Sequence, residues 1–248
     1  MSNYFFVNDY NNMTSKLDIL PLKLEPEKTA EKWKKLDKLL PQGQFILVFV
    51  APPRSGKTTT ILNMIYNDMF NYKSLYERII YISPTIMHDR TLQPIRDDEE
   101  IIKYYEHEDL DNLPALIQAI IEDQEKAKKE GDEPDTLIIL DDLLDKLRDI
   151  TLSRLAALHR HYKISLILTT QNYKSISPII RNCTSYWIIF KNHLNKEVKK
   201  LEEDFNMFPN FLQLYEACTK QRYSFMFISM DKLKVYRNFN TLVFEPVD

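Results

Sequence analysis

The strongest structural signal in the chain is the stretch QFILVFVAPPRSGKTTT, residues 44–60. Residues 44–50 form an almost wholly apolar run rich in Val, Ile and Phe, which is typical of a strand buried on both faces of a parallel sheet. Residues 51–58, APPRSGKT, follow at once and closely match the phosphate-binding pattern G-x-x-x-x-G-K-[ST]. The sequence therefore predicts a phosphate-binding loop at the end of a central strand.

A helix is expected directly after this loop. Residues 58–71 are amphipathic, with Ile61, Ile65 and Met69 recurring four apart on one face. Ala51 stands where the pattern has its first glycine, and its single methyl group is small enough to be tolerated. The alternative is a chance GKT in an ordinary loop, but strand, loop and helix occur in the order that the motif requires.

The residue types of the loop suit a triphosphate bound with magnesium. Curled backbone N–H groups and the N-terminus of a helix present positive potential to phosphates, and Gly56 permits backbone angles that a side chain would forbid. Lys57 places a cation against the β- and γ-phosphates, and the Thr58 hydroxyl is a hard oxygen ligand for Mg²⁺. We therefore expect ATP and Mg²⁺ as cofactors. The expected nucleotide-binding residues are Pro53, Arg54, Ser55, Gly56, Lys57, Thr58 and Thr59.

Composition narrows the class of protein. A chain of 248 residues has room for one α/β domain with appendages. A net charge of −3 gives no overall attraction to nucleic acid or membrane, and two cysteines without zinc-type spacing indicate a reducing compartment. The N-terminus lacks the pattern of a secretory signal, and no apolar run reaches the ~20 residues that cross a bilayer. We expect no membrane partner.

The chain divides into an N-terminal extension, residues 1–43, and a nucleotide-binding domain, residues 44–248. Residues 25–40 predict a helix whose apolar face holds Trp33, Leu36 and Leu40. The lysines of this helix indicate either a surface that faces DNA or a solvated face. Interspersed acidic residues favour the solvated face.

Strands that alternate with helices predict a mainly parallel central sheet flanked by helices. Further strands are expected at residues 77–84, 101–105, 136–140, 165–170 and 185–191. Helices are expected at residues 113–129, 145–162, 195–206 and 211–219. Residues 85–98 are expected to form a loop that exposes Arg90 and Arg96. A closing β-hairpin is expected from residues 223–229 and 234–240, with its turn at residues 230–233.

A second motif, LIILDD at residues 137–142, ends an apolar strand in two acids. Ligands of open α/β sheets bind beyond the carboxyl ends of the strands, so these acids are expected beside the loop. Asp141 would hold Mg²⁺, and Asp142 would orient or deprotonate the attacking water. Many related ATPases carry Glu at the second position, and Asp is one methylene shorter. The alternative is a helix N-cap, which Asp often supplies.

Gln171 ends the strand SLILTTQ. An uncharged amide there would touch both the γ-phosphate and the attacking water. The alternative is a polar residue at the point where a strand becomes a loop.

Four segments together resemble a known group. They are APPRSGKT, LIILDD, RHYKISLILTTQ and SPIIRNCTSYWIIF, and they lie within residues 44–190. In order and spacing they are similar to the FtsK–HerA superfamily of pumping ATPases. The resemblance is closest to the genome-packaging ATPases of poxviruses, other large DNA viruses and virophages.

This resemblance implies a RecA-like P-loop NTPase of the ASCE type, to which the residue pattern adds the C-terminal hairpin. It further implies a hexameric ring that moves double-stranded DNA into a capsid by ATP hydrolysis, with capsid proteins as partners. The expected location is the viral factory in the host cytoplasm, or the virion. The resemblance also implies that Gln171 is the γ-phosphate sensor. An arginine finger from the neighbouring subunit is expected at Arg160, with Arg181 second; the alternative for each is a salt bridge or a helix-end charge.

Two other functions fit the same loop. A nucleoside or nucleotide kinase would use it to hold ATP, although no arginine-rich lid segment follows the core. A scaffold that binds nucleotide without turnover is kept open by the shorter Asp142. The chain has no basic stripe, so DNA contacts are only suggested, at residues 85–98 and around Lys174.

Overall fold

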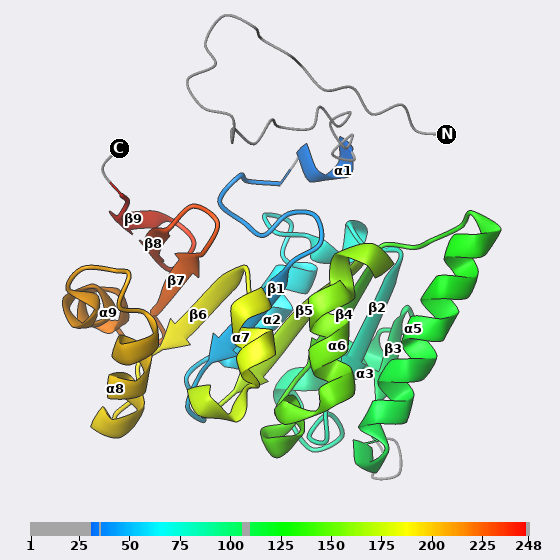
Figure 1. Ribbon diagram of the computed structural model, residues 1–248, viewed down its shortest axis with the longest axis horizontal. Helices are drawn as coiled ribbons and strands as arrows, with labels where there is room; N and C mark the ends of the chain where they lie inside the picture. The colour runs from blue at the N-terminus through cyan, green and yellow to red at the C-terminus, as the bar shows by residue number, and fades with distance from the viewer. Residues whose placement is uncertain (1–30, 35, 106–109, 247–248) are drawn as a thin grey trace, which may run out of the picture.

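The computed structural model describes residues 31–34, 36–105 and 110–246 and centres on one sheet (Figure 1). Within those residues the sheet has nine strands in the order β3-β2-β4-β5-β1-β6-β7-β8-β9. In chain order the strands are β1 (Ile46–Val50), β2 (Arg78–Ile82), β3 (Ile101–Tyr104), β4 (Thr136–Leu140), β5 (Ile164–Thr170), β6 (Tyr186–Phe190), β7 (Phe225–Ser229), β8 (Lys234–Arg237) and β9 (Thr241–Phe244).

The strands from β3 to β6 are all parallel. Every residue of β1, β4 and β5, the strands that precede the motif residues, is buried. Burial on both faces explains why their sequences are continuous apolar runs rather than alternating patterns. Because the strands are parallel, the carboxyl ends of β1, β4 and β5 meet at one edge of the sheet. The prediction of a mainly parallel sheet is confirmed.

The last three strands reverse direction. β7 pairs antiparallel with β6, β8 with β7, and β9 with β8. The predicted hairpin is therefore confirmed, with its turn at residues 230–233, and β9 is a further strand that the sequence analysis did not predict. Because of this change of direction, the segment before β7, residues 221–224, and the segment after β8, residues 238–240, lie at the edge where the parallel strands end.

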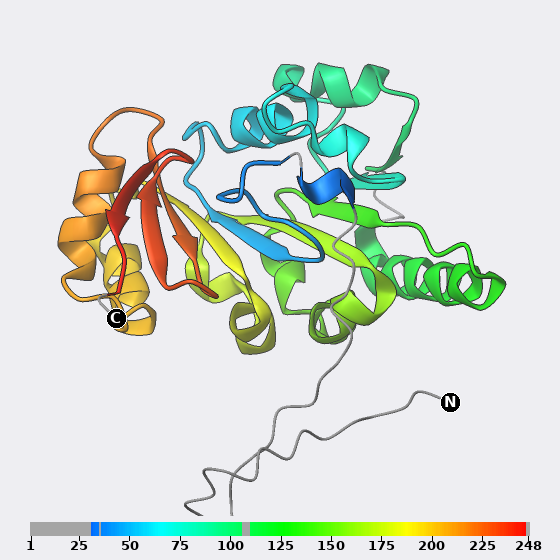
Figure 2. The ribbon, with the colours of Figure 1, turned by 90° about the horizontal axis from the view of Figure 1, so that it is seen from above.

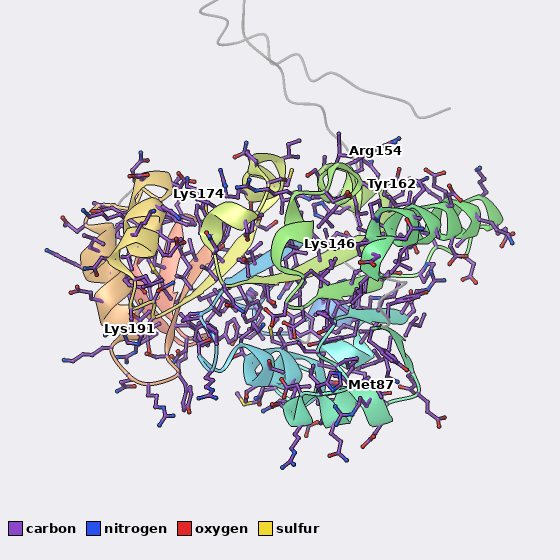
Figure 3. The ribbon with its side chains drawn as sticks, turned by 90° about the horizontal axis from the view of Figure 1, so that it is seen from below. Met87, Lys146, Arg154, Tyr162, Lys174 and Lys191 are labelled. Carbon is purple, nitrogen blue, oxygen red and sulfur yellow. The ribbon has the colours of Figure 1, made fainter. Side chains whose placement is uncertain are left out.

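Helices cover both faces of the sheet (Figure 2). One layer contains α2 (Lys57–Tyr66) and α3 (Gln93–Asp97), and the other contains α5 (Leu113–Glu130), α6 (Ile150–Leu158), α7 (Pro178–Cys183), α8 (Asn195–Asp204) and α9 (Phe211–Thr219). Figure 3 shows the two layers apart, with Met87 on the side of α2 and Arg154 on the opposite side. Successive strand residues point to opposite faces, so Val48 packs in one core and Phe49 in the other.

The helix after the phosphate loop is shorter than predicted. α2 ends at Tyr66 instead of continuing to residue 71, and Met69 is 79% exposed rather than inward. The Asn67 side chain accepts a hydrogen bond from Met69 N at 2.9 Å. Such side-chain to backbone bonds compete with helix continuation, which explains the early end.

The prediction of a single helix over residues 145–162 is wrong. The segment divides into the 3₁₀ helix η3 (Leu144–Arg148), the α-helix α6 and the 3₁₀ helix η4 (His159–Tyr162). Asp149 begins α6, because its carboxylate accepts from Thr151 N at 2.7 Å and from Leu152 N at 3.0 Å.

The prediction that residues 85–98 form a loop is wrong in part. It contains the 3₁₀ helix η2 (Arg90–Leu92) and the short helix α3. Arg90 is exposed as expected, but Arg96 is half-buried and donates to the carbonyls of Ile86 and Asp89. These two bonds hold Arg96 inside the segment, so it is a structural residue.

The N-terminal helix predicted over residues 25–40 is observed only as α1 (Glu31–Lys34), and residues 1–30 lie outside the described part. Trp33, Leu36 and Leu40 are buried as expected. Lys32 forms ion pairs with Asp135 at 2.5 Å and Glu77 at 3.4 Å, so this lysine is engaged within the chain. Among the residues that the structure describes, no helix has both the length and the apolar character needed to cross a membrane.

A candidate nucleotide site at the carboxyl edge of the sheet

The loop after β1 has the backbone of a phosphate-binding turn. Ala51 N donates to Thr170 O at 2.8 Å, which fixes the start of the loop to the neighbouring strand β5. Arg54 and Gly56 both have positive φ angles, of 62° and 101°. α2 then begins at Lys57, with neither a side-chain cap nor an acidic residue in its first turn. Its free N–H groups and its dipole favour an anion at this point.

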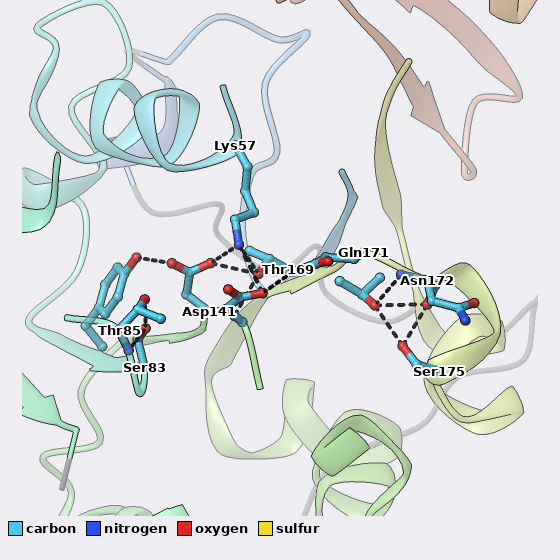
Figure 4. Close-up of polar contacts among 11 residues, drawn as sticks. Lys57, Ser83, Thr85, Asp141, Thr169, Gln171, Asn172 and Ser175 are labelled. Atoms are coloured by element: carbon cyan, nitrogen blue, oxygen red, sulfur yellow. Dashed lines mark hydrogen bonds and ion pairs between the residues drawn. The ribbon is translucent and has the colours of Figure 1, made fainter. Parts of the chain in front are cut away.

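Lys57 and the two acids of the second motif converge (Figure 4). Lys57 Nζ lies 3.0 Å from Asp141 Oδ1 and 3.5 Å from Asp142 Oδ1. Asp141 is almost completely buried, and 15% of the Lys57 side chain is exposed. A buried carboxylate needs a cationic partner because its desolvation is costly. The two motifs, more than 80 residues apart in the sequence, therefore form one site.

Thr169, which was not predicted from the sequence, links the members of this site. Its hydroxyl donates to Asp141 Oδ1 at 2.7 Å and accepts from Asp142 N at 2.9 Å and from Lys57 Nζ at 3.4 Å. β5 lies between β4 and β1, so a residue near its end reaches both motifs. The available signal was the pair of hydroxyl residues, Thr169 and Thr170, that follows the apolar run LIL at the end of the predicted strand.

Tyr81 on β2 holds the other oxygen of the Asp141 carboxylate. Its hydroxyl donates to Asp141 Oδ2 at 2.9 Å, and its side chain is fully buried. Burial, and then the charge of Asp141, raise the pKa of Tyr81 well above its usual value, so the hydroxyl stays protonated and donates. Tyr81 and Thr169 together fix both Asp141 oxygens in position.

Gln171 lies at the same edge. Its Nε2 atom donates to Asp142 Oδ1 at 3.2 Å, so the side chain predicted as sensor contacts the residue predicted as base. Asp142 has a positive φ of 61°, a strained backbone that occurs often at functional sites. The capping alternative is not observed, because the residue that caps α6 is Asp149.

The donor set suits Mg²⁺. Thr58 follows Lys57 in the first turn of α2, and Asp141 adds a carboxylate, so the two residues predicted to hold the ion would both offer hard oxygens. The described residues contain no group of three or more His, Cys, Asp or Glu side chains that would hold a metal by themselves. Mg²⁺ suits such a site, since it usually completes its shell with phosphate oxygens and water. In the loop, Ser55 Oγ is buried and lacks a hydrogen-bond partner among the described residues, as expected for a phosphate donor.

The two candidate finger arginines differ in their surroundings. Arg160, on η4, precedes β5, whereas Gln171 follows it, so the length of a seven-residue strand, about 23 Å, separates them. Arg160 is exposed and lies at the amino edge, so it cannot reach the site of its own chain. Arg181 donates to Ile176 O at 3.0 Å and pairs with Asp204 at 3.6 Å, which matches the salt-bridge alternative.

The candidate DNA contact at Lys174 is also engaged within the chain. Lys174 Nζ lies 2.8 Å from Asp204 Oδ1 and 5.4 Å from the centre of the Tyr173 ring. The charge of Lys174 is thus compensated locally, and nothing in the structure favours this residue over others as a DNA contact.

Comparison with solved structures shows the same fold. The genome packaging NTPase B204 from Sulfolobus turreted icosahedral virus 2, in complex with ATP-gammaS, matches with a TM-score of 0.57 at 16% identity, over 81% of this chain and 98% of that chain. The pCW3 conjugation coupling protein TcpA, with ATPgS, matches with a TM-score of 0.55 at 13% identity, over 79% of this chain and 61% of that chain. Both likenesses concern the P-loop NTPase fold alone, and that fold prediction is confirmed.

Two sequence comparisons identify relatives. The uncharacterized protein L437 of Acanthamoeba polyphaga mimivirus is 26% identical in an alignment 185 residues long that covers 70% of this chain and 62% of the mimivirus protein. The family model described as Poxvirus A32 protein matches residues 32–233, and this range contains every motif discussed above. The resemblance carried by the motifs is therefore confirmed, and this chain belongs to the Poxvirus A32 protein family.

Proposed function

We propose that the chain hydrolyses ATP with Mg²⁺ at the carboxyl edge of the sheet and uses the reaction to move double-stranded viral DNA into a capsid. The observation that carries this proposal is the meeting of Lys57 with Asp141 and Asp142 at 3.0 and 3.5 Å. One cation beside two carboxylates, at the N-terminus of a helix, is the charge arrangement that phosphoryl transfer needs. Support for packaging comes from the family and from the packaging NTPase B204, which shares the fold.

Each residue then has a role that follows from its place. Lys57 leaves the acids to bind the β- and γ-phosphates, together with the backbone N–H groups of the loop. Thr58 and Asp141 would hold Mg²⁺, which when bound neutralises phosphate charge. Asp142 accepts the proton of the attacking water, because it is a carboxylate at the same edge. Gln171, already bonded to Asp142 Oδ1 at 3.2 Å, orients that water and detects the γ-phosphate.

The same proposal includes a ring of subunits, of which six is the expected number. Arg160 lies at the opposite edge from Lys57, so within a ring it would serve the site of a neighbouring subunit. An arginine supplied in this way is worth about 10³–10⁵ in rate. Arg181 would first have to leave Asp204, so Arg160 is the better candidate. Capsid proteins, and the viral factory or virion as the location, belong to this proposal.

The proposal is tested by the rate of ATP hydrolysis with and without double-stranded DNA, measured together with particle mass. We expect DNA to raise the rate and the mass to reach that of a ring. Lys57→Ala should lower the rate by about 10²–10³-fold. Lys191→Ala, which removes an exposed lysine after β6 (Figure 3), should leave the rate unchanged.

Equal rates with and without DNA, from a protein that stays monomeric, would refute translocation. Transfer of the γ-phosphate to a nucleoside would instead support a kinase. Tight ATP binding without phosphate release, under every nucleic acid tried, would support a scaffold without turnover.

A further inference from the structure

The antiparallel strands bring a second wall to the phosphate loop. β7 runs antiparallel to β6, so the residues that enter β7 lie at the edge where β6 ends. The connection after β8 lies beside them, because Asn238 N donates to Phe225 O at 2.9 Å and Asn238 Oδ1 accepts from Phe225 N at 3.1 Å. Two loop segments from the end of the chain therefore face the loop after β1.

Between these segments and the phosphate loop lies a cavity of about 1080 Å³. The loop lines one side of it. The other side presents the rings of Tyr223, Phe225 and Phe239 and the amides of Asn238 and Asn240, and Phe70, from the segment after α2, also lines the cavity. Phe70 and Phe239 contact each other edge to face at 5.5 Å, so the segment after α2 and the connection after β8 meet at this wall. The cavity thus continues directly from the place where phosphates would bind.

The Tyr223 side chain lies against Gly56 of the loop. A Cβ atom on Gly56 would meet Tyr223 Cδ1 at 3.4 Å. Tyr223 is 55% exposed and has a φ of 66°, a left-handed conformation that bulky residues rarely adopt. The Arg222 guanidinium lies 4.7 Å from the centre of the Tyr223 ring. An exposed aromatic ring is thus held in a strained backbone against the phosphate loop, which is the kind of outlier that points to function.

The chemistry of this wall matches a nucleobase. Aromatic rings stack on bases, and an arginine supports such a stack. The Asn238 and Asn240 side-chain oxygens already accept hydrogen bonds, from Phe225 N and from Thr241 Oγ1. Their amide NH₂ groups donate to no described residue, and they can donate to ring nitrogens of a base.

We propose that this cavity holds the purine base of the nucleotide, with Tyr223 stacked on the base and the amides of Asn238 and Asn240 donating to its edge. This inference rests on the proposed function, in that the phosphates occupy the loop after β1. The closing strands then contribute to nucleotide recognition although they carry none of the residues that act on the phosphates.

The test compares a non-hydrolysable ATP analogue with inorganic tripolyphosphate, which lacks base and ribose. Binding of both is measured by calorimetry for the wild-type chain, Tyr223→Asn and Tyr223→Phe. Asparagine accepts the left-handed conformation readily, so Tyr223→Asn should keep its melting temperature while losing the ring. We expect Tyr223→Asn to bind the ATP analogue about 5- to 100-fold more weakly than the wild type, and to bind tripolyphosphate with unchanged affinity. Tyr223→Phe keeps the ring and should bind both like the wild type.

A matched control lies at the other end of the same strands. Leu233, in the turn between β7 and β8, also has a positive φ, of 50°, and is 41% exposed. Leu233→Asn should therefore change neither affinity.

The inference is overturned if Tyr223→Asn binds the ATP analogue as tightly as the wild type does, or if it binds both ligands more weakly by the same factor. Should the wild type bind both ligands equally tightly, with both affinities lost in Lys57→Ala, the base pocket is refuted while the phosphate site stands. If the wild type binds neither ligand, the proposed function fails as well.

Discussion

The parallel and antiparallel parts of the sheet contribute in different ways to the same edge. The parallel strands β1, β4 and β5 deliver charged and hydroxyl groups that are bonded to one another within 3.5 Å, with Asp141 and Thr169 buried. The antiparallel strands deliver aromatic rings and amides around an open cavity. The comparison shows that buried strands position the charged and hydroxyl groups, whereas the aromatic rings and amides come from connections near the surface.

The largest effect is expected within the parallel part. Asp142→Asn removes the carboxylate that would accept a proton from water but keeps the shape of the side chain. Turnover should fall by about 10²–10⁴-fold while binding of an ATP analogue is retained. Rates measured beside calorimetric affinities would separate the two effects. Unchanged turnover would show that Asp142 is not the base and would leave the chemistry without its assigned residue.

A smaller effect is expected at the tyrosine that holds Asp141. Tyr81→Phe removes a donor from a buried carboxylate, so the free energy of unfolding should fall by about 1.5–3 kcal/mol. The control is Tyr72→Phe, which removes an equally buried hydroxyl from the neutral carbonyl of Pro41 and should cost about 1 kcal/mol. Denaturant unfolding measures both. Equal losses would indicate that the Asp141 charge adds nothing to its bond with Tyr81.

Gly56 lies where the two parts meet, and Gly131 gives a comparison far from the site. Both have positive φ angles, of 101° and 80°, so an alanine should destabilise either position by about 1 kcal/mol. Only at Gly56 would the new methyl group contact Tyr223, and nothing lies within 4 Å at Gly131. Gly56→Ala should therefore weaken ATP binding, whereas Gly131→Ala should not. Equal affinities in the two variants would argue that the parts do not meet at the loop.

The smallest effect concerns the reactivity of a buried cysteine that packs against the antiparallel part. Cys218, on α9, is buried beside Tyr236, and burial raises the pKa of its thiol to about 11. On the order of a thousandth of this thiol is ionised at pH 8, so it should react very slowly with thiol reagents. The labelling rate in a Cys183→Ser background, followed against denaturant, checks this. Labelling that precedes global unfolding would show that the antiparallel part opens independently.

Sequence patterns predicted the parallel part well, because its signals are local. Apolar runs of strand length located β1, β4 and β5 within a residue or two, and the acids after β4 were placed correctly beside Lys57. Helix ends were less predictable. The side chains of Asn67 and Asp149 decided where α2 ended and where α6 began, and their hydrogen bonds compete closely with helix propagation.

The motifs and their order along the chain were enough to predict a phosphate-binding loop beside the paired acids and to identify the family. The contacts of Thr169 and Tyr81 with Asp141, and the place of Tyr223 beside Gly56, were not predictable in this way. They depend on which strands become neighbours and in which direction each runs, namely β5 between β4 and β1, β2 beside β4, and β7 antiparallel to β6. Strand order results from packing between residues far apart in the chain, and a local pattern carries no information about it.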